Sequence, residues 1–364
     1  MRVLVVDDSA LMRRLLSGIL SEAGFAVDTA RNGEEGVAKL LEWKPDAVTL
    51  DINMPEMDGL TALSLMMQAR PTPVVMVSSL TEKGAMATFE ALALGAVDFV
   101  AKPGGTISLS IQSVAEELVG KIHAAVKMRA AGTRSRLSEA SRSTSRPAAV
   151  RPESRPVRTV TPRSTGRMES TANRIPGVVL IGVSTGGPRT LEDILPELPV
   201  DFGWPVVVAQ HMPPKFTDAF ARRMDGLCAL TVREVSSTMP LEAGNVYIGQ
   251  GGTDIVVAER LGRTVVLGRP ESAEHPWHPS VDVLVNSAMA LLRPQQIVGV
   301  LLTGMGNDGA VSMTRLKQAG GRTIAEAASS AVVFGMPREL IELEGASIVL
   351  PCTSVATQLC KWLG

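Results

Sequence analysis

Short apolar runs that alternate with amphipathic helical stretches constrain the fold of this 364-residue chain more than any other feature. The alternation occupies both ends of the chain and is typical of β-α-β units with a parallel sheet. Both ends are therefore predicted to be α/β domains. In the second domain, Gly262 lies between two apolar runs and predicts a β-hairpin. The expected strands are residues 2–6, 26–29, 47–50, 73–77 and 97–100, then 178–183, 206–210, 246–248, 255–258, 264–267, 297–303 and 347–350.

The middle of the chain has a different composition. Residues 129–174 are rich in Arg, Ser, Thr, Pro and Ala and poor in large apolar side chains, so they cannot offset their ordering entropy by burial. We predict a first domain at 1–122, a flexible linker at 123–175 and a second domain at 176–364. A flexible chain of about 40 residues spans roughly 35 Å, so the two domains can touch each other. The basic bias of the linker leaves a second interpretation open, an arm that binds an acidic partner.

The overall composition argues against several classes of protein. A net charge of −1 and an aromatic content of 3% do not favour a nucleic-acid binder. Cys228, Cys352 and Cys360 form no C-x-x-C pair, and their odd number argues against a disulfide framework. The N-terminus does not have the plan of a signal peptide, and no apolar run approaches about 18 residues. We expect a cytoplasmic protein with no nucleic-acid partner and no membrane insertion.

Polar side chains follow four predicted strands of the first domain. In an open parallel sheet these strand ends lie at one edge, where ligands usually bind. Carboxylates gathered there suit a divalent cation such as Mg²⁺, and an aspartate among them can accept a phosphoryl group. The side chains concerned are Asp7 and Asp8, Asp51, Ser78 and Ser79, and Lys102.

The motifs VVDDS, LDINMPEMDG, VSSLT and GAVDFVAKP resemble the receiver domain of two-component response regulators. The resemblance implies a flavodoxin-like fold with a five-stranded parallel sheet and a histidine kinase as phosphodonor. It also implies that Asp51 is the phosphorylated residue and that Mg²⁺ is needed for its phosphorylation. The other implied roles are Mg²⁺ binding by Asp7, Asp8, Asp51 and Asn53, and switching by Ser78, Phe99 and Lys102.

The stretch VVLIGVSTGGP of the second domain delivers Ser184 to the end of a strand. Its spelling fits the G-x-S-x-G turn of serine hydrolases, and it also fits a phosphate-binding loop or a tight turn. Pro188 near the start of the following helix agrees with a strand-to-helix turn. Backbone N–H groups at such a helix start can stabilise an oxyanion or hold a phosphate.

A nucleophilic serine needs a base and an orienting carboxylate. His211 directly follows strand 206–210, and Asp308 lies just after strand 297–303. The chain order Ser, His, Asp differs from that of the α/β-hydrolases. A nucleotide site is disfavoured because GVSTGG lacks the lysine of a P-loop. A zinc site at His275 and His278 is disfavoured because no further ligands have suitable spacing.

The motifs IGVSTGGP, VVVAQHMPPKFTDAFARRM, HPSVDVLVNSA, LLTGMGNDGA and VVFGMP resemble the catalytic domain of chemotaxis receptor methylesterases. The resemblance implies a doubly wound α/β domain with a mostly parallel sheet. Ser184 is then the nucleophile, His211 the general base and acid, Asp308 its orienting carboxylate, and Thr185 and Met305 line the oxyanion hole. The implied reaction is hydrolysis of γ-glutamyl methyl esters on chemoreceptor helices with release of methanol, and many members also deamidate receptor glutamines. The ester hydrolysis needs no cofactor.

The second domain departs from the family pattern at three places. Val183 stands where alanine is expected, IGQGGTD at 248–254 replaces a segment that often reads Ala-Pro-Gly-Gly and ends in histidine, and AEAASSAVVFGMP lacks acidic residues after Glu326. None of these departures replaces one of the three proposed catalytic residues, but each can alter the substrate groove. Two alternatives stay open: a transcription-type regulator with a helix-turn-helix, and a phosphorylation-gated scaffold without catalysis. We also expect the unphosphorylated first domain to cover the Ser184 edge.

Overall fold

The computed structural model describes residues 1–79, 81–102, 114–127 and 175–363. The first of the two α/β bodies contains a sheet of strand order β2-β1-β3-β4-β5, in which every pairing is parallel. Its strands are β1 (Arg2–Val6), β2 (Ala26–Ala30), β3 (Ala47–Asp51), β4 (Val74–Ser78) and β5 (Asp98–Ala101). These five strands and their parallel arrangement confirm the prediction. Most of the predicted linker, 123–175, lies outside the described residues, and a helical segment at 114–127 crosses its predicted start.

Alternating apolar residues divide the first sheet into two packed faces. Val3 and Val5 point to the side covered by α1 and the 114–127 segment, and Leu4 and Val6 point to the side covered by the other three helices. Each helix begins at a residue whose side chain accepts a backbone N–H, an arrangement that stabilises helix starts. The helices are α1 (Ala10–Glu22), α2 (Gly33–Trp43), α3 (Gly59–Ala69) and α4 (Glu82–Ala93), capped by Ser9, Asn32, Asp58 and Thr81.

The second body is built on a seven-stranded sheet of order β15-β14-β13-β6-β7-β10-β8, again with every pairing parallel. A strand-rich domain of this size is not a helix-turn-helix module, which removes the transcription-type alternative. Its strands are β6 (Val178–Val183), β7 (Val206–Gln210), β8 (Thr231–Val235), β10 (Asn245–Gly249), β13 (Ile297–Leu301), β14 (Arg322–Glu326) and β15 (Ile348–Leu350).

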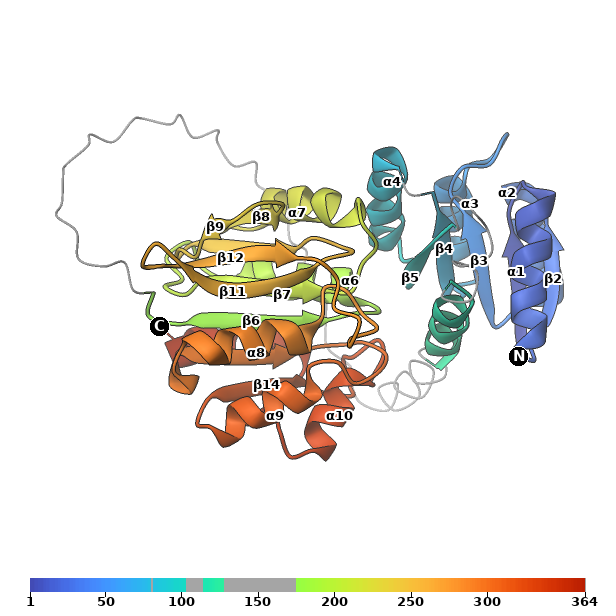
Figure 1. The fold of residues 1–364 in the computed structure, drawn as a ribbon. Coiled ribbons are helices and arrows are strands. Elements are labelled where there is room, and N and C mark those ends of the chain that lie inside the picture. The colour runs from blue at the N-terminus through green and yellow to red at the C-terminus, as the bar shows by residue number, and fades with distance from the viewer. Residues whose placement is uncertain (80, 103–113, 128–174, 364) are drawn as a thin grey trace, which may run out of the picture.

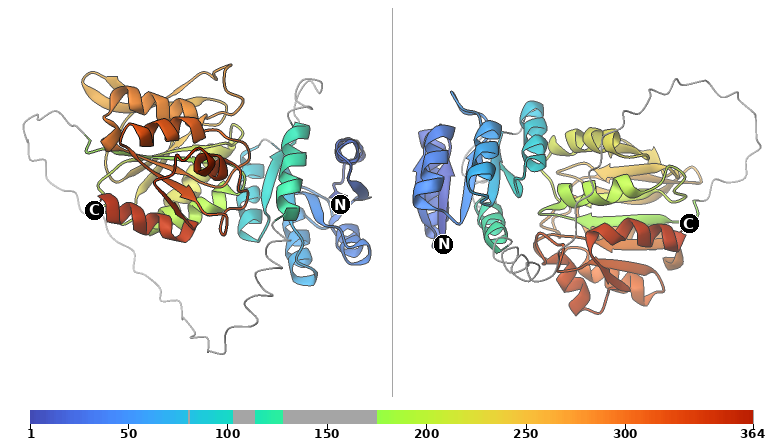
Figure 2. Two further views of the ribbon diagram at one scale, coloured as in Figure 1. Left: turned by 90° about the horizontal axis from the view of Figure 1, so that it is seen from below. Right: turned by 180° about the vertical axis from the view of Figure 1, so that it is seen from behind.

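Helices cover both faces of this sheet (Figure 2). One face packs on α6 (Gly187–Ile194), α7 (Phe216–Leu227) and α11 (Val355–Leu363). The other packs on α8 (Val281–Leu291), α9 (Ala310–Gln318) and α10 (Met336–Glu342). Short 3₁₀ turns lie at Leu195–Glu197, Pro294–Gln296 and Cys352–Ser354. Because both faces are covered, the central strands β6, β7 and β13 are nearly continuous apolar runs.

A small antiparallel sheet lies beside α8. Strand β11 (Asp254–Arg260) pairs with β12 (Arg263–Arg269) around Gly262, whose φ is +71°, and β12 pairs with β9 (Met239–Pro240). The predicted hairpin is thus confirmed. Strands β8, β9 and β14 were not predicted, because TVREV and RTIAE each contain only two apolar residues and β9 is only two residues long.

The two bodies meet through α4 and α7, which lie side by side (Figure 1). Phe89 lies against Phe220 with ring centroids 5.5 Å apart, and Phe99 stacks on Phe216 at 4.7 Å. The buried apolar core is therefore continuous from the first body into the second. Among the described residues, no helix has both the length and the apolar character needed to cross a membrane.

Candidate active site

Ser184 directly follows β6, at the carboxyl edge of the seven-stranded sheet. Its backbone N–H donates to Thr303 O at 2.9 Å, and Gly187 N–H donates to Ser184 O at 2.8 Å, which closes a tight turn into α6. Gly186 has φ +79°. A Cβ on Gly187 would lie 2.0 Å from Gln210 Oε1, so only glycine fits there.

His211 follows the neighbouring strand and pairs with Asp308. Its backbone N–H donates to Val183 O at 3.0 Å, and its Nε2 lies 2.8 Å from Asp308 Oδ2. An ionised carboxylate only accepts hydrogen bonds, so the Nε2 atom carries the hydrogen. The other ring nitrogen, Nδ1, is buried and has no hydrogen-bond partner among the described residues. This nitrogen is therefore available to accept a proton.

The Asp308 carboxylate is saturated with hydrogen bonds. Oδ2 accepts from His211 and from Val281 N–H at 2.7 Å, and Oδ1 accepts from Ser280 Oγ and Asp282 N–H, both at 3.0 Å. Burial raises the pKa of this carboxyl, but the hydrogen bond and charge of His211, with the two backbone donors, outweigh it and hold the pKa below its usual value. The residue is therefore kept ionised, as an orienter of histidine requires.

Ser184 lies near the His211–Asp308 pair but forms no hydrogen bond with His211 Nδ1. The amide of Gln210 donates to both Ser184 O at 3.0 Å and His211 O at 2.9 Å, which ties the two strand ends together. A Cβ on Gly304 would lie 2.8 Å from Ser184 Cβ, so the loop after β13 closes over the serine. His211 Nδ1 receives no hydrogen bond from Ser184, a contact that in many enzymes tightens only in the substrate complex.

Of the expected oxyanion residues, Thr185 directly follows Ser184 in the chain, and Met305 directly follows Gly304, which packs against the serine. Thr185 is buried, and its carbonyl accepts from Thr303 Oγ1 at 2.9 Å. Thr303 is in turn held by buried Glu326, whose Oε2 accepts Thr303 N–H at 2.7 Å. Glu326 is not among the site residues predicted from the sequence. Its position at the end of β14 would have pointed to this edge if that strand had been predicted.

The first domain gathers its polar residues as expected. The carboxylates of Asp7, Asp8 and Asp51 have oxygens within 4.8 Å of one another, a donor set that suits Mg²⁺. Lys102 Nζ lies 3.1 Å from Asp7 and 2.8 Å from Asp51. Burial, together with the charge of Asp7, raises the pKa of Asp51 against the effect of Lys102. Asn53, two positions after Asp51, is exposed, and its N–H donates to Asp51 Oδ1 at 3.3 Å.

The expected switch residues lie between this carboxylate cluster and the second domain. Ser78 is buried, and its hydroxyl donates to Gly84 O at 3.2 Å. Phe99 is buried against Phe216 of α7. The adjacent Asp98 accepts the N–H of Gly186, at 3.2 Å, across the domain boundary. A continuous chain of contacts therefore leads from β5 to the turn that carries Ser184.

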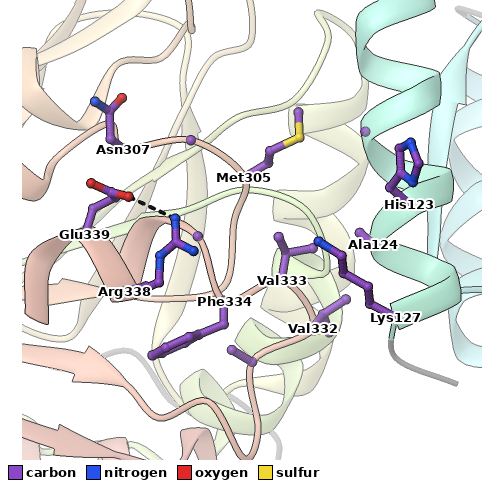
Figure 3. A pocket seen from close by; sticks show the side chains of 14 residues that line it. His123, Ala124, Lys127, Met305, Asn307, Val332, Val333, Phe334, Arg338 and Glu339 are labelled. Carbon is purple, nitrogen blue, oxygen red and sulfur yellow. Dashed lines mark hydrogen bonds and ion pairs between the residues drawn. The ribbon is translucent and has the colours of Figure 1, made fainter. Parts of the chain in front are cut away.

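A cavity of about 830 Å³ separates the 114–127 helix from the loops around Ser184. Figure 3 shows His123, Ala124 and Lys127 on the helix facing Met305, Val332 and Val333 of the second domain. A Cβ on Gly120 would lie 2.6 Å from the sulfur of Met305, so the two domains are in close contact at one end of this cavity.

The fold and the site define a response regulator whose output domain carries a Ser–His–Asp arrangement. Residues 3–111 match the protein family described as "Response regulator receiver domain", and residues 179–359 match the family described as "CheB methylesterase". Receiver domains of this kind undergo Mg²⁺-dependent phosphorylation.

Full-length relatives resemble the whole chain. It is 53% identical over 366 residues to "Protein-glutamate methylesterase/protein-glutamine glutaminase 3" of Rhodospirillum rubrum, covering 100% of this chain and 96% of the relative. It is 49% identical over 362 residues to a protein of the same description, number 2, of Rhodopseudomonas palustris, covering 99% and 98%. A crystal structure of the Thermotoga maritima CheB methylesterase catalytic domain is 37% identical, with a TM-score of 0.49, and covers 51% of this chain and 97% of that one.

The chain belongs to the family of protein-glutamate methylesterases/protein-glutamine glutaminases that join a receiver domain to a CheB methylesterase domain. The names of these relatives are those of enzymes, which gives no support to the alternative of a non-catalytic scaffold.

Proposed function

We propose that this chain is a phosphorylation-activated hydrolase that demethylates glutamate γ-methyl esters on chemoreceptors and also deamidates receptor glutamines. The observation that carries the proposal is the 2.8 Å pairing of His211 with Asp308, next to Ser184 at one edge of the sheet. The names of the relatives supply the substrate class, a methylated glutamate or a glutamine of a protein.

In the proposed acylation step, His211 Nδ1 takes the hydroxyl proton of Ser184 as Oγ bonds to the ester carbonyl carbon. Backbone N–H groups of Thr185 and Met305 donate to the oxyanion that forms. The bond between the carbonyl carbon and the methoxy oxygen then breaks, and the methoxy group leaves as methanol with the proton from His211. Asp308 stabilises the histidine while it is protonated.

In the proposed deacylation step, water replaces methanol. His211 takes a proton from the water as its oxygen bonds to the acyl carbon, and the bond to Ser184 Oγ breaks with return of a proton to that oxygen. Glutamate is released, and no metal or organic cofactor takes part. A glutamine side chain follows the same two steps and releases ammonia in place of methanol.

Regulation is proposed to begin at Asp51, which receives a phosphoryl group from a histidine kinase. Asp7, Asp8, Asp51 and Asn53 would hold a Mg²⁺ ion, which would neutralise charge on the phosphoryl group when bound. The phosphate adds nearly two negative charges beside Lys102, and Ser78 and Phe99 move in response. The Phe99–Phe216 stack and the Asp98–Gly186 hydrogen bond then loosen.

The interdomain cavity is an observation in favour of both a receptor helix as the partner and regulation of access by the receiver. Its lining combines the apolar Met305, Val332 and Val333 with the cationic Lys127, a surface that suits an amphipathic receptor helix bearing acidic residues. The receiver helix at 114–127 forms one wall of this cavity, so an unphosphorylated receiver restricts access to Ser184 from this side. Separation of the domains would widen the approach.

The proposal is tested by methanol release from methyl-labelled chemoreceptor in membranes. Wild type is compared with Ser184→Ala and with Ser237→Ala, a change of an exposed serine on the loop before β9. We expect Ser184→Ala to lower the rate by about 10⁴-fold or more, on the scale of nucleophile losses in other Ser–His–Asp hydrolases, and Ser237→Ala to leave it unchanged. Methanol release that survives in Ser184→Ala would refute the nucleophile assignment.

A further inference from the structure

An indole ring lies over the proposed catalytic base. Trp277, in the loop between β12 and α8, stacks on His211 with ring centroids 5.7 Å apart and ring planes within 2° of parallel. A Cβ on Gly306 would lie 2.8 Å from the same indole, so Trp277 also packs against the loop that carries Met305. Trp277 therefore bridges the histidine and the proposed oxyanion loop.

A single buried carboxylate holds the loop that presents this indole. Asp254, at the start of β11, accepts three hydrogen bonds of 2.9 Å, from Ser272 N–H, His278 Nδ1 and Ser280 N–H. These donors lie on both sides of Trp277, so the loop is fixed at each end. Asp254 is almost completely buried, and such charge-assisted hydrogen bonds are the strong ones.

Asp254 is the last residue of IGQGGTD, one of the segments that departs from the usual pattern of this family. The clamp it forms gives that departure a structural meaning, because Asp254 and the loop it holds lie next to the active site. The departure therefore affects the lining of the groove and leaves the proposed Ser–His–Asp residues unchanged.

We propose that Trp277, positioned by Asp254 and His278, sets the orientation of His211 and selects apolar leaving groups. This inference rests on the proposed ester hydrolysis. The leaving alcohol takes its proton from His211, so it must come within hydrogen-bond reach of that ring. A side chain stacked on the ring is consequently next to the leaving group, and an indole face favours an alkyl group over a polar one.

The selectivity is measured with receptor peptides that carry isosteric esters. The γ-glutamyl n-propyl and 2-hydroxyethyl esters differ by a methyl and a hydroxyl group, and the methyl ester serves as reference. We expect Trp277→Ala to lower the ratio of kcat/KM for the propyl ester to that for the hydroxyethyl ester by about three- to tenfold, since a partly exposed wall discriminates less than a closed pocket. Trp277→Phe, which keeps an aromatic face, restores most of the ratio.

The positioning role predicts a second effect. Loss of the stack leaves the imidazole less well oriented, so kcat for the methyl ester falls by about tenfold while KM changes less. Asp254→Asn keeps an acceptor but loses the charge of the clamp, and changes both quantities in the same direction by a smaller factor. Trp362→Ala is the control, because that indole contacts Arg322 at the start of β14, the end of the sheet away from Ser184.

Two results are distinguishable. If wild type does not hydrolyse the methyl ester, the proposed function fails. If wild type is active but the propyl-to-hydroxyethyl ratio of kcat/KM in Trp277→Leu and in Trp277→Ala stays within twofold of the wild-type ratio, the role of Trp277 is overturned. Circular dichroism identifies any variant that does not fold. If Trp277→Ala does not fold, the comparison of Trp277→Leu, which removes the aromatic face, with Trp277→Phe, which keeps it, decides the outcome.

Discussion

Phe99 of β5 stacks on Phe216 of α7, with ring centroids 4.7 Å apart and an angle of 17° between the rings. A residue expected to switch in the receiver is thus in direct contact with the helix that follows His211. This contact connects the proposed phosphorylation site to the catalytic domain through one layer of side chains.

Phe99→Leu is predicted to raise the basal activity of the unphosphorylated protein. The change keeps apolar bulk but removes an aromatic pair worth about 0.5–1.5 kcal/mol, so we expect methanol release to increase about two- to tenfold. Removal of the receiver, leaving residues 175–364, is expected to have a larger effect. Methanol release is measured with and without a phosphodonor. When both proteins are fully phosphorylated, we expect Phe99→Leu and wild type to release methanol at the same rate. An unchanged rate after removal of the receiver, or a lower basal rate in both variants, would contradict restriction by the receiver.

Asp308→Asn is predicted to disable hydrolysis and to weaken the fold. An amide replaces one acceptor with a donor that faces the existing donors, so His211 loses its orientation and kcat falls by about 10⁴-fold. The unpaired buried groups lower the free energy of unfolding by about 1–3 kcal/mol. Urea unfolding and methanol release measure the two effects, with Asp201→Asn, at an exposed aspartate, as control. Wild-type activity in Asp308→Asn would remove this carboxylate from the mechanism.

Glu326 is predicted to make stability depend on pH. Burial raises the pKa of this carboxyl above 4.5, against the hydrogen bonds from Ser330 and Thr303. The native state therefore holds the proton more tightly than the unfolded state, a stabilisation that is complete below about pH 4.5 and is lost as the pH rises through the folded pKa.

Glu326→Gln keeps an acceptor for Thr303 N–H and removes this titration. Urea midpoints measured from pH 4.5 upward should fall less steeply in the variant than in wild type. The comparison is between the two proteins because Asp51, Asp98 and Glu234 also have raised pKa values and act in the same direction in both. Parallel curves would show that Glu326 is not the group responsible.

Metal removal is predicted to block phosphorylation without affecting basal hydrolysis. Chelation with EDTA, or Asp8→Ala, removes the cation or one of the three clustered carboxylates, so phosphate incorporation from a labelled kinase should fall by at least about tenfold. Asp51→Asn should incorporate none. Methanol release by the unphosphorylated enzyme is the internal control, because the proposed esterase chemistry uses no metal. Equal incorporation with and without EDTA would contradict the proposed Mg²⁺ site.

Much of the architecture could be predicted because strand ends encode it. In a parallel sheet every strand ends at the same edge, so polar residues after the apolar runs at β6, β7 and β13 predicted that Ser184, His211 and Asp308 lie near one another. The same reasoning placed Asp7, Asp51 and Lys102 together. Strand β14 was not predicted, because RTIAE has too few apolar residues to be distinguished from a loop. Glu326, at the end of this strand, was missed for the same reason.

Contacts between distant loops could not be predicted in this way. Trp277 and His211 are 66 positions apart, and their stacking depends on how Asp254 folds the intervening loop, which no local pattern specifies. The domain interface is similar, because Phe99 and Phe216 have the features of ordinary core residues within their own segments. Only the assembled chain reveals that they belong to opposite sides of a boundary.

The four donors to Asp308 come from His211 and from the stretch 280–282, while the carboxylate itself arrives after β13. A polypeptide still being synthesised possesses Ser184 and His211 long before it possesses the carboxylate that pairs with the imidazole. Hydrolytic competence would thus arise late in biosynthesis, after the receiver that is proposed to restrain it has already been made.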